Sequence, residues 1–198
     1  MQYRTRGRTD LKVSFVGLGT GGPSRLGQKT HGDRDQSQRV VHEALEKGIN
    51  LFDTAAAYSD SEMILGEALK EIPRGDYLLA TKFSPQNADS QEIISPGELV
   101  EACEKSLRRL GVETIDIYQF HGLVPDNYRT AVDKLFPTME QLRSAGKIRF
   151  IGVTEYFFET LGNPVPDVPR DQIVDYMVDH NQWIVGTPDD CIAGINRL

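Results

Sequence analysis

The sequence predicts an α/β fold in which short parallel strands alternate with amphipathic helices. Two observations predict it. Apolar and β-branched runs of four to eight residues recur along residues 11–154, and apolar residues recur at helical spacing between them. Strand–helix units in this order form a parallel sheet covered by helices. The 198 residues are 39% hydrophobic with a net charge of −7, an ordinary composition for one globular core.

Basic residues near the start alternate with polar and apolar ones around Gly7 and Asp10, which favours a solvated β-hairpin over an anion-binding tail. They are Arg4, Arg6, Arg8 and Lys12. Five strands of the parallel sheet are then expected, at residues 11–18, 50–53, 77–83, 115–121 and 148–154.

Helical periodicity predicts four helices between these strands, at residues 35–47, 61–69, 96–110 and 130–145. Pro96 in the first turn and Gly111 after the last are typical of helix ends. Gly48 and Gly146 end two of the other helices, and Ser61 is expected to cap the helix that it opens.

Composition also excludes several classes of protein. The acidic balance argues against a nucleic-acid surface. No secretory signal follows the N-terminal charges, and no apolar run is long enough to span a membrane. Cys103 and Cys191 lack metal-binding spacing, so we expect two reduced, buried thiols in a cytoplasmic protein.

Polar residues close four successive predicted strands, and Tyr58 follows the first of them by five residues. The four are Asp53, Lys82, His121 and Thr154. In a parallel barrel the equivalent strand ends meet on the face where active sites form. An open doubly wound sheet has the same strand–helix rhythm, but Gly17 and Gly19 lack the third glycine and the later acidic partner of its nucleotide-binding motif. The barrel is therefore favoured.

These residue types suit the reduction of a carbonyl group. Hydride addition produces an alkoxide, which needs a proton donor such as Tyr58. A neighbouring ammonium from Lys82 would lower the pKa of that phenol, and Asp53 would keep Lys82 charged. His121 could orient the carbonyl oxygen. None of these side chains can deliver hydride, so a nicotinamide cofactor is expected.

The motifs that contain these residues resemble those of the aldo-keto reductases, in the same order and spacing. They are Val16–Gly21, Phe52–Tyr58, Ala80–Phe83, Gln119–Gly122, Ser106–Gly111 and Gly146–Val153. The resemblance covers residues 1–154 and implies a TIM-type (β/α) barrel that reduces a small aldehyde or ketone with NADPH. It implies Tyr58 as proton donor, Lys82 as its activator, Asp53 as the supporting acid and His121 as the orienting residue.

Each of these residues alone also has an ordinary structural interpretation: a helix cap for Asp53, a surface lysine for Lys82, a structural histidine for His121 and a packing residue for Tyr58. The ordered combination favours a site. The resemblance further implies cofactor contacts from Gly19, Thr20 and Asp53. Thr154 and Glu155 stand where many family members have Ser-Asn against the nicotinamide, so they are either cofactor ligands or ordinary loop residues.

Residues 155–198 form a divergent tail within what we interpret as one partial barrel domain. The Gly186-Thr187 segment resembles a terminal phosphate-binding loop. Asp189 and Asp190 stand where the family has basic residues, so NADH is not excluded. The stretches 163–166, 183–190 and 195–198 are similar to the C-terminal end of luciferase-like flavin monooxygenases, through fusion, truncation or coincidence.

Three functions follow from the sequence. The first is NAD(P)H-dependent carbonyl reduction, and the second is an inactive reductase-like fragment or regulatory binding protein. The third, a flavin monooxygenase, has support only from the tail. Because a complete barrel needs about 250 residues, we expect this shorter chain to be marginally stable, to self-associate through the edge of an incomplete barrel, and to bind cofactor weakly.

Overall fold

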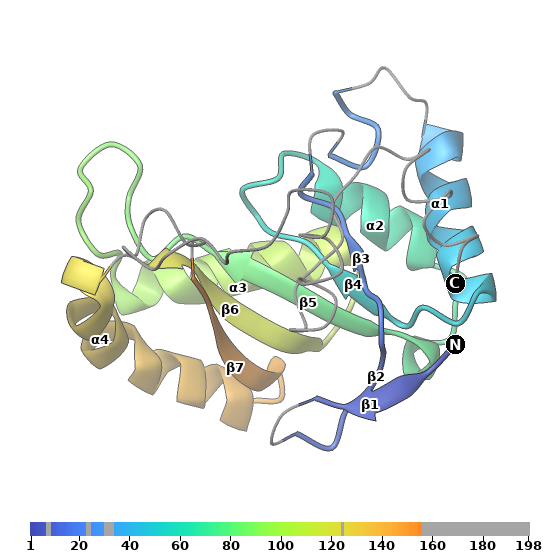
Figure 1. Ribbon diagram of the computed structural model, residues 1–198. Coiled ribbons are helices and arrows are strands. Elements are labelled where there is room, and N and C mark those ends of the chain that lie inside the picture. Colours follow the sequence, from blue (N-terminus) through green and yellow to red (C-terminus); the bar gives the residue numbers. More distant parts are fainter. Residues whose placement is uncertain (7–8, 23–24, 30–33, 124, 156–198) are drawn as a thin grey trace, which may run out of the picture.

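The computed structural model describes residues 1–6, 9–22, 25–29, 34–123 and 125–155 (Figure 1). The predicted tail after Glu155 therefore lies outside the described residues, and with it Cys191 and the Gly186-Thr187 loop. No helix in the described ranges is both long enough and apolar enough to cross a membrane.

In the described part of the chain, five parallel strands form the central sheet, and they lie side by side in the order in which they occur in the sequence. They are β3 (Leu18–Gly19), β4 (Leu51–Asp53), β5 (Leu78–Phe83), β6 (Ile115–Leu123) and β7 (Ile148–Glu155). Each pair of neighbouring strands in this sheet is connected along the chain through at least one helix, as in a TIM-type (β/α) barrel. The predicted α/β barrel fold is confirmed for this part of the chain.

The N-terminal hairpin is also present, but the first predicted strand is divided. Strand β1 (Tyr3–Thr5) pairs antiparallel with β2 (Lys12–Ser14), and β3 begins only at Leu18. The prediction of one continuous strand over residues 11–18 was wrong because the chain bends at Phe15 and Val16, after contacts of Ser14 end β2. The Ser14 hydroxyl donates to the Val16 carbonyl at 2.6 Å, and the Ser14 amide donates to Asn50 Oδ1 at 2.8 Å.

Four α-helices and one short 3₁₀ helix connect the strands (Figure 1). They are α1 (Arg34–Glu46), α2 (Ser61–Leu69), the 3₁₀ helix η1 (Arg74–Asp76), α3 (Pro96–Leu110) and α4 (Pro125–Ser144). Helix α3 has the predicted ends, with a capping box between Ser95 and Glu98 and Gly111 in the left-handed conformation.

One helix start and one helix cap differ from the prediction. Helix α4 begins at Pro125, five residues before Thr130, since proline is well suited to a first turn. Ser61 is not the cap of α2. Asp60 occupies that position, and the Ser61 hydroxyl donates instead to the Thr20 carbonyl at 3.2 Å.

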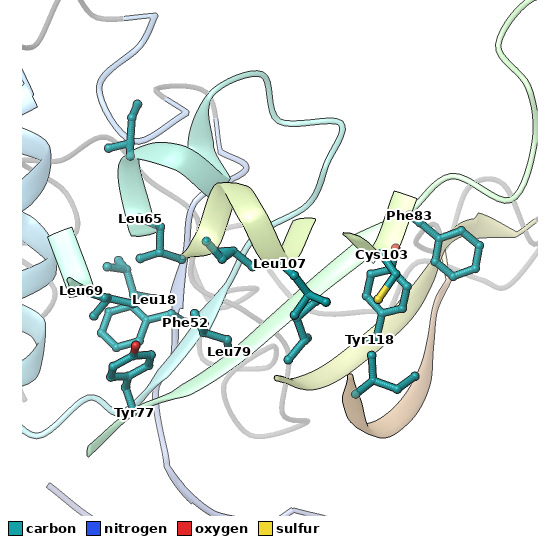
Figure 2. Packing of buried hydrophobic residues seen from close by; sticks show 14 of the residues in the cluster. Leu18, Phe52, Leu65, Leu69, Tyr77, Leu79, Phe83, Cys103, Leu107 and Tyr118 are labelled. Carbon is teal, nitrogen blue, oxygen red and sulfur yellow. The ribbon is translucent and has the colours of Figure 1, made fainter. Parts of the chain in front are cut away.

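The two faces of the sheet carry different cores. Residues such as Phe52, Leu79 and Tyr118 pack outward against the helices, and Phe83 stacks on Tyr118 with ring centroids 5.1 Å apart (Figure 2). Cys103 lies in this outer core as a buried free thiol, as predicted. A smaller cluster faces inward and joins the hairpin to the strands; it contains Leu11, Val13, Leu51, Ala80 and Ile117.

A buried carboxylate connects the sheet to two helices. Glu62 of α2 is fully buried and accepts hydrogen bonds from the Thr81 hydroxyl at 2.6 Å and from Arg109 Nε at 2.7 Å. Arg109 Nη2 lies 2.7 Å from the same carboxylate, so the guanidinium of α3 binds it through two nitrogens. Removal of one partner from a buried ion pair leaves the other charge without compensation and destabilises the fold.

Arg109→Leu should therefore lower the free energy of unfolding by about 3–5 kcal/mol, because the substitution leaves the Glu62 charge buried with only one partner. Chemical denaturation followed by far-ultraviolet circular dichroism measures the loss. Arg108→Leu is the matched control, since Arg108 is exposed on the same helix. Equal losses in the two variants would contradict the role given to the Glu62–Arg109 pair.

Candidate functional site

The carboxyl ends of the parallel strands bring the predicted polar residues together on the inner face. Asp53 ends β4, Lys82 lies near the end of β5, and His121 lies near the end of β6. Side chains alternate between the two faces along a strand. Lys82 therefore faces inward between the outward-facing Thr81 and Phe83.

Lys82 and Asp53 form a buried ion pair at the centre of the site. The Lys82 side chain donates to Asp53 Oδ1 and, at 2.9 Å, to the Thr54 carbonyl. Lys82 is 2% exposed and Asp53 is 5% exposed. Ion pairs this deep retain both charges only when the partners stay in register. The pair thus fixes the end of β4 relative to β5.

Burial raises the pKa of the Asp53 carboxyl group, and the neighbouring Lys82 ammonium opposes that rise. The Arg6 guanidinium of the N-terminal hairpin and the Gln119 side chain also act to lower it. Burial in turn lowers the pKa of Arg6, while the charge of Asp53 raises it. The hairpin therefore contributes a positive charge to the electrostatics of the site.

Tyr58 lies over this ion pair, on the loop between β4 and α2. The Lys82 Nζ atom is 5.2 Å from the centroid of the Tyr58 ring. Gly21 faces the same ring: a Cβ atom at that position would lie 2.3 Å from Tyr58 Cε2, closer than any side chain permits. The absence of a side chain at Gly21 therefore gives the tyrosine its space.

His121 completes the cluster beside Tyr58. The two rings meet edge to face, with centroids 5.5 Å apart and planes at 88°. Burial, reinforced by the charge of Lys82, lowers the pKa of His121 from 6.5 to about 4. The imidazole is therefore neutral near pH 7, with one nitrogen able to donate a hydrogen bond and the other able to accept one.

The predicted cofactor residues fall into three groups. Gly19 pairs with Asp53 in the sheet, and the Thr20 amide donates to the Asp53 carbonyl at 2.9 Å, so both lie beside the ion pair. The backbone of Thr154 lies opposite His121, and that of Glu155 lies opposite Leu123. The side chains of Thr154 and Glu155 lie outside the described part of the structure. Gly186 and Thr187 lie outside the described residues.

Gln119 is a site residue that the sequence analysis did not single out. It is 6% exposed and pairs with Lys82 across the sheet, and its side chain acts to lower the pKa of Asp53. Gly152 of β7 makes room for it, because a Cβ atom there would lie 2.9 Å from Gln119 Cγ. The available signal was its spacing: Gln119 precedes His121 by two residues and so shares its face of the strand.

A second polar cluster lies at the opposite ends of the same strands. A cavity of about 580 Å³ there is lined by residues that include Arg74, Tyr77, Asp116 and Arg149. The buried Asp116 carboxylate accepts from Arg74 Nη2 at 2.5 Å and from Arg149 Nη1 at 3.0 Å. Two guanidinium groups thus share one buried carboxylate, and these bonds connect the starts of β5, β6 and β7, so we assign this cluster a structural role.

The sequence of this chain matches the model of a known protein family. A model described as the aldo/keto reductase family matches residues 16–178, which is most of the chain. The chain belongs to the aldo/keto reductase family. The family match continues past residue 154, where the sequence predicted a divergent tail.

Individual members of the family agree with this assignment. The chain is 36% identical over 164 residues to the NADH-specific methylglyoxal reductase of Escherichia coli, an alignment that covers 74% of this chain and 49% of that protein. The chain spans about half the length of the curated relatives that it matches.

Solved structures of aldo-keto reductases share the fold. The holo form of AKR11C1 from Bacillus halodurans superposes with a TM-score of 0.65 at 31% identity, covering 93% of this chain and 55% of that one. An aldo-keto reductase from Klebsiella pneumoniae in complex with NADPH gives a TM-score of 0.56 at 28% identity, covering 76% and 49%.

The environment of His121 predicts a specific pH dependence. The pKa is about 4 in the folded protein against a reference value of 6.5, so the unfolded chain binds more protons between these values. The contribution of His121 to stability should therefore be lost as the pH falls from about 6.5 to 4. Imidazole NMR should give a titration midpoint near 4, and His121→Gln should flatten the fall in unfolding free energy. A midpoint above 6 would contradict the buried, lysine-facing environment.

Proposed function

We propose that this protein reduces an aldehyde or ketone to an alcohol with a nicotinamide cofactor, and that Tyr58 is the proton donor. The convergence of three side chains from separate elements carries the proposal. The ammonium of Lys82 lies 5.2 Å from the centroid of the Tyr58 ring, and the centroid of the His121 ring lies 5.5 Å from the same point. A phenol, a buried cation and a neutral imidazole are groups suited to assist carbonyl reduction, with hydride supplied by the cofactor.

Lys82 has the role of activating Tyr58. A buried ammonium beside a phenol favours the phenolate, which makes proton transfer easier near neutral pH. Asp53 is the positioning partner, because its bond to Lys82 holds the ammonium beneath the tyrosine ring. Asp53 is thus predicted to act through Lys82 and not on the substrate.

His121 is suited to orient the carbonyl group. Because its pKa is lowered to about 4, the imidazole adds no positive charge to the site near pH 7. A neutral imidazole beside the phenol can donate one hydrogen bond to a carbonyl oxygen. That oxygen would then lie within reach of both His121 and Tyr58, the arrangement needed for proton donation.

The strand ends beside the ion pair fit a bound nicotinamide nucleotide. The Thr20 hydroxyl is buried and has no hydrogen-bond partner among the described residues, so a polar ligand group could satisfy it. Gly19 leaves the backbone accessible next to it, and Asp53 lies opposite. When bound, the cofactor supplies the hydride. We propose NADPH, as in the Klebsiella complex, with NADH as an alternative suggested by the E. coli relative.

The tested reaction is the reduction of 4-nitrobenzaldehyde, a reactive carbonyl compound, with oxidation of NADPH followed at 340 nm. Tyr58→Phe should lower kcat by about 100-fold or more, because a general acid contributes roughly 10²–10⁴ to such a step. Tyr3→Phe is the control. Tyr3 is exposed in the hairpin, and its hydroxyl donates to the Gly48 carbonyl, away from the carboxyl ends of the parallel strands where the candidate site lies.

Equal turnover in Tyr58→Phe and the wild type would remove Tyr58 from the mechanism. Absence of turnover together with absence of NADPH and NADH binding, measured by fluorescence titration, would favour the second function predicted from the sequence. That alternative is a reductase-like protein without activity.

A further inference from the structure

We infer that Gln28 is a positioning residue for Tyr58, an inference that rests on the proposed function. Tyr58 lies on an irregular loop, where backbone position is not fixed by a helix or strand. Its own local bonds, from the Tyr58 amide to the Ala55 carbonyl and from the Ser61 amide to the Tyr58 carbonyl, move together with the loop. The Ala56 amide donates to the Lys82 carbonyl at 3.1 Å and holds the start of the loop to β5. The part of the loop that follows Tyr58 depends on a further contact from another segment.

The Gln28 side chain supplies that contact at three of the four residues 58–61. Its Oε1 accepts from the Asp60 amide at 3.0 Å. Its Nε2 donates to the Ser61 hydroxyl at 2.9 Å and lies 3.3 Å from the Tyr58 carbonyl. The Asp60 N–H can only donate, so it fixes which end of the Gln28 amide is oxygen.

The remaining residue of the four is held by a neighbour of Gln28. Arg25 Nη1 lies 2.8 Å from the Ser59 hydroxyl. Ser59 has a φ of 54°, a left-handed conformation that is strained for a residue with a side chain unless its surroundings hold it. Gln28 Nε2 also donates to the Arg25 carbonyl at 2.8 Å, so one amide organises both sides of the contact.

The same contacts connect the tyrosine to the proposed cofactor residues. The Ser61 hydroxyl receives the Gln28 bond and donates to the Thr20 carbonyl at 3.2 Å. The Thr20 amide in turn donates to the Asp53 carbonyl. Gln28 thereby sets the position of the Tyr58 loop relative to the strand ends that hold Thr20 and the Lys82–Asp53 pair.

Two substitutions of Gln28 test this role in the full chain. Gln28→Met keeps the length of the side chain but makes no polar contact. Gln28→Glu keeps the acceptor for the Asp60 amide but loses the donor to Ser61. The control is Gln141→Met, an exposed glutamine on α4. NADPH and 4-nitrobenzaldehyde are the substrates, and hydrogen exchange is measured at the Asp60 amide.

Gln28→Met should lower kcat by roughly 10-fold to 100-fold, because a displacement of about 1 Å in a reacting group costs up to about 10² in rate. The KM for the aldehyde and the Kd for NADPH should change less than about threefold, since the ligand-facing groups remain. Gln28→Glu should be intermediate. A purely structural role would lower the folded fraction and so change kcat without speeding exchange of the Asp60 amide relative to the amides of α2.

The inference is overturned if Gln28→Met matches Gln141→Met both in kcat and in Asp60 exchange. If the wild type itself reduces no aldehyde, the proposed function fails, and the exchange data still decide the inference. Faster Asp60 exchange in Gln28→Met would then support the positioning of the loop, and unchanged exchange would reject it.

Discussion

The buried ion pair between Lys82 and Asp53 is the interaction on which the rest of the site depends. Two opposite charges, both nearly inaccessible to water, are stable only if strands β4 and β5 keep their register. The pair fixes the ammonium under the ring of Tyr58, and that charge also contributes to the neutral state of His121. The electrostatics of the site thus follow from one contact between adjacent strands.

Charged groups hold both faces and both ends of the sheet. Glu62 and Arg109 connect the outer face to α2 and α3, while Asp116 joins Arg74 and Arg149 at the strand starts. Each central carboxylate is almost fully buried. Glu62 and Asp116 each bind more than one side chain, whereas Asp53 binds Lys82. The three groups differ in what lies above them: only the Lys82–Asp53 pair has a phenol and an imidazole against it. That difference separates the candidate active site from the structural clusters.

Much of the described fold could be predicted from the sequence, because it depends on local signals. Apolar and β-branched runs indicated the strands, and Pro96 and Gly111 indicated the ends of α3. Equivalent strand ends converge, so Asp53, Lys82 and His121 could be placed together. Three features could not be predicted: the bend that follows Ser14, the hydrogen bond of Ser61 and the contacts of Gln28. Each depends on a partner more than ten residues away in the sequence. Gln119 was missed although its strand spacing indicated its face.

A double-mutant cycle of Lys82→Met and Asp53→Leu tests the central claim most directly, with unfolding free energies from denaturant titration at pH 7. Each single variant leaves one buried charge unpaired and should lose about 3–5 kcal/mol. The double variant should lose clearly less than the sum, with a coupling energy of about 2 kcal/mol or more. The loss in Lys82→Met should shrink toward pH 4, because the unpaired Asp53 carboxyl then accepts a proton in the folded state. Additive losses that do not change with pH would contradict the account.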